Sequence, residues 1–206
     1  MRRLRIYLTT TLLVVATQAG TILVDTGGGQ DLRLLAYGEA TVDWGDADKQ
    51  DDRLCTLAFA ACELQHYLRT LTGKQDDWHI ADSRPRPVDP TIRLVTQPDS
   101  KGLDPEGYTL RHSGTEGNWT LTVTGGGRVG TLYGVYDLLH RLGVRWYAPG
   151  DANETVPAID LTAPPAIDCA EAPAFKLRGF HAWEDRGDEE FLLWMARNRL
   201  NYWCVE

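Results

Sequence analysis

The glycine-rich stretch "TVTGGGRVGTLYG" at residues 122–134 constrains the fold of this chain more than any other segment. Gly125, Gly127 and Gly130 have the spacing of a dinucleotide-binding turn, between a strand-like run and a helix-like run. In dinucleotide-binding folds the preceding strand is parallel, central and apolar on both faces. Here that strand, "TLTVT", carries a threonine at every second position and belongs to a hairpin. The turn is therefore predicted to be structural, letting the chain reverse tightly and pack the next helix on a sheet.

The residues around this turn predict a mixed set of strands and helices up to about residue 165. Helical spacing of leucines and alanines, with Gly73 as a stop signal, predicts a long helix over 52–73. The acidic stretch 43–52 lacks the glycine and acid that a calcium loop needs, so it is interpreted as a solvated loop. The other predicted elements are strands at 21–25, 32–38, 91–97 and 144–150, a hairpin of 107–114 with 118–125, and a helix at 131–143.

The last forty residues change character. Residues 174–183 are strand-like, 188–201 are helical with Asp188 as a predicted N-cap, and 202–206 begin another strand. Strand, helix and strand at this spacing are typical of the opening of an α/β repeat. A proline-rich connector precedes this segment, so a domain boundary is expected between 165 and 172. Some thirty residues cannot close a (β/α)8 barrel, which takes about 250.

The amino terminus resembles a secretory signal peptide. Three arginines within the first five residues precede an apolar run from Ile6 to Val15, and small residues follow near Ala19. The apolar run is too short to span a bilayer. The expected organisation is a signal peptide at 1–20, an α+β domain at 21–168 and a first β-α-β piece of a barrel at 169–206, in a secreted or periplasmic protein. The alternative for the first segment is a buried strand or helix.

Charge and cysteine usage exclude several classes of function. A formal net charge of −8 argues against a nucleic-acid surface, which needs a basic footprint. Cys55 and Cys62 lie about 10 Å apart along one predicted helix, too far to bridge, and are expected in the core. Cys169 and Cys204 could pair, and the sequence leaves that open. No CxxC motif is present, so neither a metal nor a cofactor is predicted.

Four stretches together resemble a known family. They are "ACELQHYLRTLTG", "TGGGRVGTLYGVYDLLHRLGVRWYAPG", "FKLRGFHAWED" and "WMARNRLNYW". Over about residues 21–206 they resemble the N-terminal half of large exported glycoside hydrolases, namely family 67 α-glucuronidases, family 20 β-N-acetylhexosaminidases and related uncharacterised bacterial proteins. The resemblance implies an α+β fold, a sheet with helices packed on one side, followed by an incomplete (β/α)8 barrel. It does not fix the sugar or linkage.

The resemblance also implies substrate-binding residues. Family 20 enzymes carry an Arg-Gly pair at the end of the first barrel strand, and Arg178-Gly179 matches it. The Arg178 guanidinium would hydrogen-bond to a sugar, and Trp183 would stack on a sugar face. Glu184 stands where α-glucuronidases have an aspartate, which departs from that family's pattern. For Arg178 an ion pair with Glu184 or Asp185 is the structural alternative, and for Trp183 it is core packing.

No catalytic residue is assigned within the chain. Glycoside hydrolysis needs two carboxyl groups, which by resemblance come from later barrel strands. The chain is therefore interpreted as the N-terminal fragment of a secreted, α-glucuronidase-like glycoside hydrolase acting on poly- or oligosaccharides, and as inactive alone. One alternative is a non-catalytic carbohydrate-binding or scaffold module. The other, less favoured, is a nucleotide-binding oxidoreductase.

Overall fold

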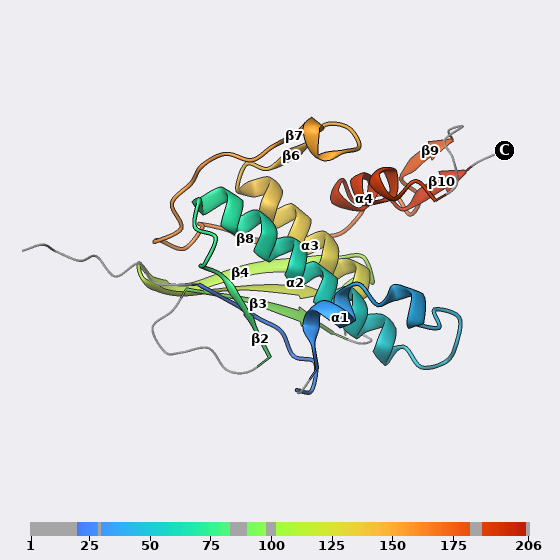
Figure 1. Ribbon diagram of the computed structural model, residues 1–206, viewed down its shortest axis with the longest axis horizontal. Helices are drawn as coiled ribbons and strands as arrows, with labels where there is room; N and C mark the ends of the chain where they lie inside the picture. The colour runs from blue at the N-terminus through green and yellow to red at the C-terminus, as the bar shows by residue number, and fades with distance from the viewer. Residues whose placement is uncertain (1–19, 29, 83–89, 98–101, 182–186, 205–206) are drawn as a thin grey trace, which may run out of the picture.

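The structure is a computed structural model that describes residues 20–28, 30–82, 90–97, 102–181 and 187–204. Its main layer is a six-stranded mixed sheet, and two long helices, α2 and α3, lie side by side on one face of it (Figure 1). A smaller unit of two strands and one helix stands apart from this sheet near the carboxyl terminus. The predicted α+β class is confirmed.

The large sheet has the order β2-β1-β3-β5-β4-β8. Its strands are β1 (Thr21–Leu23), β2 (His79–Ala81), β3 (Thr91–Thr96), β4 (Tyr108–Thr115), β5 (Asn118–Gly125) and β8 (Asp168–Glu171). β2, β1, β3 and β5 run parallel to one another, whereas β4 runs antiparallel to both β5 and β8. The predicted hairpin is present as β4 and β5, with the parallel pairing of β5 to β3 as a feature that the sequence pattern did not predict.

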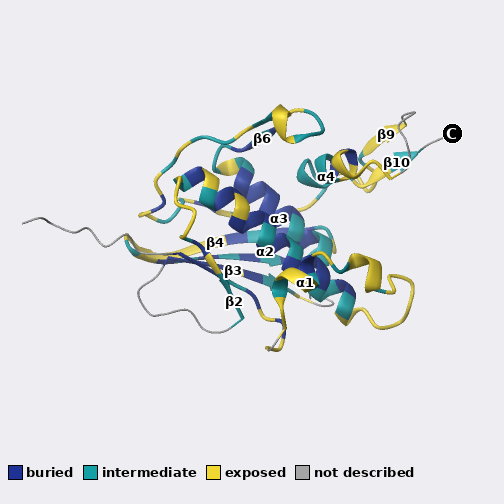
Figure 2. Ribbon diagram, viewed as in Figure 1, coloured by how far each residue is buried: buried dark blue, intermediate teal, exposed yellow. Residues whose placement is uncertain are grey.

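Alternation along β5 separates the two faces of the sheet. Trp119, Leu121 and Val123 are buried beneath the helices, while the three threonines that alternate with them are half-buried on the other face. Figure 2 shows the burial concentrated where α2 (Gln50–Thr72) and α3 (Arg128–Arg141) meet the strands. The sheet is thus covered by helices on one face, as predicted.

The burial of helix α2 and its end at Gly73 are both explained by its sequence. Its first half is apolar nearly all round, and both Leu64 and Leu68 are fully buried. Gly73 ends it with a positive φ of 67°, a left-handed conformation that favours glycine. In α3, Val135 and Leu139 are fully buried, whereas Leu132 and the C-capping Leu142 are half-buried.

The glycine turn between β5 and α3 packs against the protein's own backbone. The N–H of Gly126 donates to the carbonyl of Gly107 at 2.9 Å, and the N–H of Gly130 donates to that of Pro105 at 3.2 Å. A Cβ at Gly126 would lie 2.1 Å from the Asp104 carbonyl oxygen. The segment 104–107 therefore occupies the place where a dinucleotide phosphate would have to approach. This geometry gives the structural interpretation of the turn its physical basis.

The prediction of a strand at 32–38 is wrong. Residues 32–36 form the short helix α1 (Leu32–Ala36), followed by a 3-10 turn, η1 (Glu39–Thr41). The Asp31 carboxylate accepts hydrogen bonds from the N–H groups of Arg33 and Leu34, which is N-capping. The cap therefore satisfies the N–H groups of Arg33 and Leu34. In a strand, these groups would have needed partners on a neighbouring strand.

The chain leaves the large sheet in two steps. After α3, the short hairpin β6 (Arg145–Trp146) and β7 (Glu154–Thr155) encloses a 3-10 turn, η2 (Asp151–Asn153). β8 then returns to pair with β4 and crosses the predicted boundary at residue 168, so the large sheet extends to Glu171. We call residues 20–171 the body.

Beyond the body, β9 (Gly179–His181), α4 (Glu189–Arg197) and β10 (Tyr202–Cys204) form a strand–helix–strand unit. β9 and β10 are parallel and belong to a separate two-stranded sheet. Asp188 caps α4 as predicted, accepting from the Phe191 N–H at 3.0 Å. We call residues 179–204 the βαβ unit.

Candidate functional site at the junction of the body and the βαβ unit

Arg178 lies immediately before β9, at the junction between the body and the βαβ unit. Its Nη2 donates to Glu106 Oε2 at 2.7 Å, and its Nε donates to the Arg199 carbonyl oxygen at 2.9 Å. Its guanidinium also lies over the ring of Tyr133, 5.7 Å from the centroid. Arg178 thus connects the loop before β4 to the turn between α4 and β10.

Arg178 lies at the other end of its strand from the end that the sequence resemblance suggested. The family pattern places such an arginine at the carboxyl end of a barrel strand, but here it precedes β9 and lies at its amino end. Among the described residues Arg178 forms an ion pair with Glu106, and the alternative partners Glu184 and Asp185 lie outside those residues. Trp183 and Glu184 lie outside the described residues. The substrate-binding role of these three residues stays a prediction.

A second arginine, Arg197, is the most buried of the three arginines at the junction, with only 10% of its side chain exposed. Its Nε donates to Glu63 Oε2 at 3.1 Å, and its Nη1 lies 3.8 Å from Glu154 Oε2. The guanidinium also lies over the rings of Tyr67 and Trp146. Burial opposes the charge, but the Glu63 carboxylate outweighs it and raises the pKa of Arg197 above its usual value.

Two buried tyrosines complete this cluster. The hydroxyl of Tyr136 donates to Glu63 at 3.1 Å, and that of Tyr67 donates to Glu154 at 2.6 Å. Burial, and then the neighbouring carboxylates, raise the pKa of both phenols. These tyrosines therefore stay protonated as donors. We call Glu63, Tyr67, Tyr136, Glu154 and Arg197 the Arg197 cluster.

A third arginine, Arg199, follows α4 in a left-handed conformation with φ of 59°. Its Nη1 donates to Asp137 Oδ1 at 2.7 Å and to the Tyr108 hydroxyl at 3.0 Å. Asp137 also accepts from Arg141 Nε at 2.8 Å, so one carboxylate of α3 binds two arginines. A conformation that is uncommon for arginine is thus held by contacts with the body.

The chemistry of the junction is that of attachment. Each carboxylate described above is paired with a guanidinium, and burial disfavours ionisation of the phenols. These carboxylates are Glu63, Glu106, Asp137 and Glu154. Neither a free general base nor an activated nucleophile results from such pairing. Sequence reasoning missed this cluster, although an acid on the buried side of an apolar helix, Glu63, was a detectable signal.

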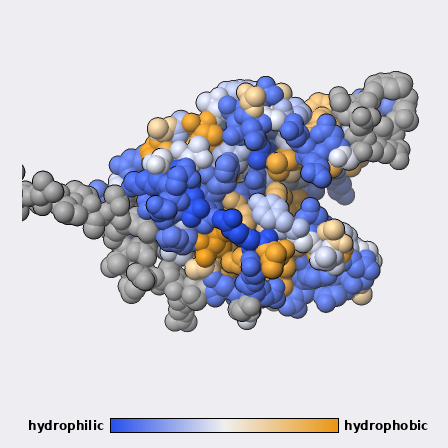
Figure 3. Space-filling model, in the orientation of Figure 1, coloured by the Kyte–Doolittle hydropathy of each residue, from blue (hydrophilic) through white to orange (hydrophobic). Residues whose placement is uncertain are grey.

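The βαβ unit and the segment just before it carry much of the exposed apolar surface of the described residues. The face of the molecule in view in Figure 3 is mostly hydrophilic, with hydrophobic side chains in small patches. Among the described residues, nine large hydrophobic side chains are exposed, and five of these lie between residues 175 and 202. They are Phe175, Leu177, Phe180, Leu192 and Tyr202.

Other kinds of site find little support in the described part of the chain. No group of three or more metal-ligating side chains occurs among the described residues. Nor does any helix within the described ranges combine the length and apolar character needed to cross a bilayer. All four cysteines are free thiols, including Cys169 and Cys204, and Cys55 is buried as expected.

Comparisons with known proteins find similarity at the level of structure and not of sequence. No protein-family model matches the chain, and no curated protein sequence does so either. One similar solved structure is a GH138 enzyme targeting pectin rhamnogalacturonan II, with a TM-score of 0.43 and 17% sequence identity. The match covers 89% of this chain and 23% of that enzyme. The likeness is distant and the chain spans less than a quarter of its neighbour, so the functional argument has to come from the chain's own residues.

Proposed function

We propose that this chain is the amino-terminal part of a secreted glycoside hydrolase acting on poly- or oligosaccharides, α-glucuronidase-like by its motifs. In this proposal the body supports a catalytic (β/α)8 barrel whose first strand is β9. The observation that carries the proposal is the βαβ unit, a parallel pair of strands in its own sheet, joined to the body through side chains.

A parallel pair of strands favours a larger surrounding sheet. Parallel sheets occur almost only with both faces covered by helices or by further strands. Here Phe180 on β9 and Tyr202 on β10 are 39% and 38% exposed, and Leu192 on α4 is 45% exposed. Additional β/α units would cover these side chains and complete the hydrogen bonding of the strand edges. A barrel supplies both, and it is the architecture that the sequence resemblance implies.

The attachment of α4 to the body supports a scaffold role for the body. Arg197 and Arg199 both bind carboxylates of the body, and Trp194 Nε1 donates to the Trp146 carbonyl oxygen at 3.1 Å. In a barrel the loops that follow the strands carry the substrate. On this proposal the loop after β9, which contains Trp183 and Glu184, faces the sugar, while Arg178 at the opposite end of β9 fixes the strand to the body.

The test compares two proteins on the same substrates. We expect the protein encoded by a reading frame continuing past Glu206 to release reducing sugars from acidic polysaccharides such as glucuronoxylan or pectin. The 206-residue chain alone should release none, because the paired carboxylates that hydrolysis needs are not assigned within it. A coding sequence that ends at Glu206, or hydrolysis by the short chain itself, would contradict the proposal.

A further inference from the structure

A cavity of about 310 Å³ opens in the body at the carboxyl ends of two parallel strands. Asp25 and Thr26 follow β1, and Arg93 to Thr96 form the second half of β3. The first turns of α2, from Gln50 to Leu57, supply the remaining wall. In open sheets with parallel strands, ligands bind outside the carboxyl ends of the strands. The volume is at the lower end of the range for small-molecule sites, the size class of a single sugar.

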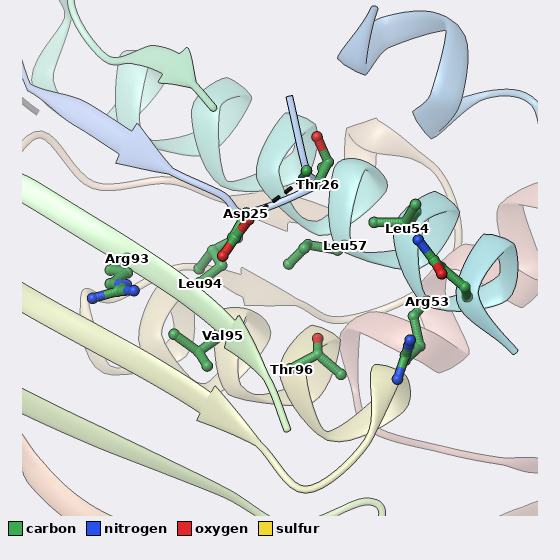
Figure 4. Close-up of a pocket in the computed structure, with 11 residues that line it drawn as sticks. Asp25, Thr26, Arg53, Leu54, Leu57, Arg93, Leu94, Val95 and Thr96 are labelled. Atoms are coloured by element: carbon green, nitrogen blue, oxygen red, sulfur yellow. Dashed lines mark hydrogen bonds between the residues drawn. The ribbon is translucent and has the colours of Figure 1, made fainter. Parts of the chain in front are cut away.

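The cavity combines apolar and charged walls. Leu57 and Leu94 are buried and give it an apolar floor. Figure 4 shows Arg53 and Arg93 at opposite ends of the view, with Asp25, Leu57 and Thr96 between them. Among the described residues, the guanidinium groups of these two arginines have no hydrogen bond or ion pair. In a chain with a net charge of −8, the unpaired guanidinium of Arg53 in the cavity wall favours an anionic ligand, whereas Arg93 is exposed and alternates with buried Leu94 along β3.

The wall after β1 is held in place. Asp82 accepts hydrogen bonds from the Thr26 N–H at 2.9 Å and from the Thr26 hydroxyl. Burial acts to raise the pKa of Asp82, but these donors outweigh it and lower that pKa below its usual value. Within the described part of the chain, the Asp25 carboxylate next to Thr26 accepts only a long contact from the Gly27 N–H, at 3.4 Å, which leaves its oxygens available to hydroxyl donors.

From these features we propose that this cavity binds a sugar acid of monosaccharide size. The Arg53 guanidinium would bind the carboxylate through paired hydrogen bonds, and Asp25 would accept from hydroxyl groups of the ring. The floor of Leu57 and Leu94 would contact the C–H face of the ring. The proposal concerns the body alone and does not rest on the glycoside hydrolase proposal.

Isothermal titration of the 206-residue chain with sodium glucuronate tests the proposal. We expect saturable binding of glucuronate, and no saturable binding of glucose or acetate, which lack the carboxylate and the hydroxyls respectively. The methyl glycoside of glucuronic acid separates two sources of the ligand. If it binds as well as glucuronate, the cavity accepts the end of an acidic polysaccharide, and if only glucuronate binds, the ligand is the free sugar acid.

Two variants and one control locate the binding. Arg53→Gln and Asp25→Asn should each weaken glucuronate binding about tenfold, the effect of losing one charge-assisted hydrogen bond. Arg33→Gln removes an exposed arginine of α1 outside the cavity and should leave binding unchanged. Far-UV circular dichroism checks that each variant is folded. Failure of the unmodified chain to bind glucuronate, equal binding of acetate, or full affinity in folded Arg53→Gln would each overturn the proposal.

Discussion

Arg197 shows how a single buried charge can attach one part of this protein to another. Its guanidinium satisfies Glu63 and approaches Glu154, two carboxylates that lie on different segments of the body. A buried ion pair contributes little over an apolar replacement, but removing one partner leaves the other charge buried and unpaired. The Arg197 cluster therefore shows that α4 is attached to the body, and it says less about the total free energy of unfolding of the protein.

We expect Arg197→Ala to lower the free energy of unfolding by about 3–5 kcal/mol, because Glu63 would be left with a buried, unpaired charge. Urea denaturation followed by tryptophan fluorescence measures this. Arg111→Ala is the matched control, since its ion pair with Asp168 is about half exposed, at 52% and 61%, and should contribute at most about 1 kcal/mol. Equal losses in the two variants would contradict the role given to Arg197.

At the residue scale the sequence pointed to the segment around Arg178, whose substrate-binding role stays a prediction. Arg178 was singled out from an Arg-Gly pair, and it does lie where the body meets the βαβ unit. Its partner Glu106 is 72 residues away, so no local pattern could reveal that ion pair. Glu63 could have been noticed, because an acid among buried alanines and leucines needs a partner.

Helices and strands could be predicted where the residues within the element itself indicate its structure. The long helix α2 was predictable because leucine spacing, acids in its first turn and Gly73 all agree. The short helix α1 was not, because its apolar run also suits a strand and five residues carry little periodicity. Its capping residue, Asp31, was the signal that favoured a helix.

His140 in the last turn of α3 makes the free energy of unfolding depend on pH. Burial, and then the nearby positive charge of Arg145, lower the pKa of His140 below 6.5. The unfolded chain therefore binds a proton more readily than the folded chain as the pH falls through about 6.5. The free energy of unfolding that His140 contributes is complete above this pH and is lost as the pH falls towards the lowered folded pKa.

We expect His140→Gln to remove this part of the pH dependence. Between pH 7 and pH 5 the free energy of unfolding of the variant should fall less steeply than that of the unmodified protein. Urea denaturation at several pH values measures both slopes. His79→Gln, in an exposed residue of β2, controls for loss of a histidine as such. Identical slopes in the unmodified protein and the His140 variant would show that His140 is not the group responsible.

For the whole molecule, the sequence predicted the two layers and the separate βαβ unit but not how the strands are arranged. Hairpin pairing of β4 with β5 is local and was found, whereas the pairing of β3 with β5 and of β8 with β4 joins distant segments. Such pairings depend on packing that no single stretch of sequence specifies. Strands β9 and β10 form their own sheet and do not join the one that contains Leu121, as a separate βαβ unit requires.

The architecture predicts that the βαβ unit unfolds locally while the body stays folded. Strands β9 and β10 pair only with each other among the described strands, so the βαβ unit is held to the body mainly by side chains such as Arg197 and Arg199. Regions with few buried contacts open at lower free energy than the core. Amide hydrogens of α4 should therefore exchange faster than those in the middle of α2, as mass spectrometry or NMR can measure.

Arg199→Gln sharpens that prediction, because it removes the ion pair with Asp137 and leaves the core of the body untouched. Losing this charged interaction should speed exchange in α4 about tenfold and leave exchange in α2 unchanged. Arg33→Gln, which changes an exposed arginine of α1, should alter neither helix. Equal protection of α4 and α2, or a parallel change in both helices on substitution of Arg199, would mean that body and βαβ unit unfold as one cooperative structure. The βαβ unit would then be an integral part of the body, and its interpretation as the first piece of a separately folding barrel would lose its physical support.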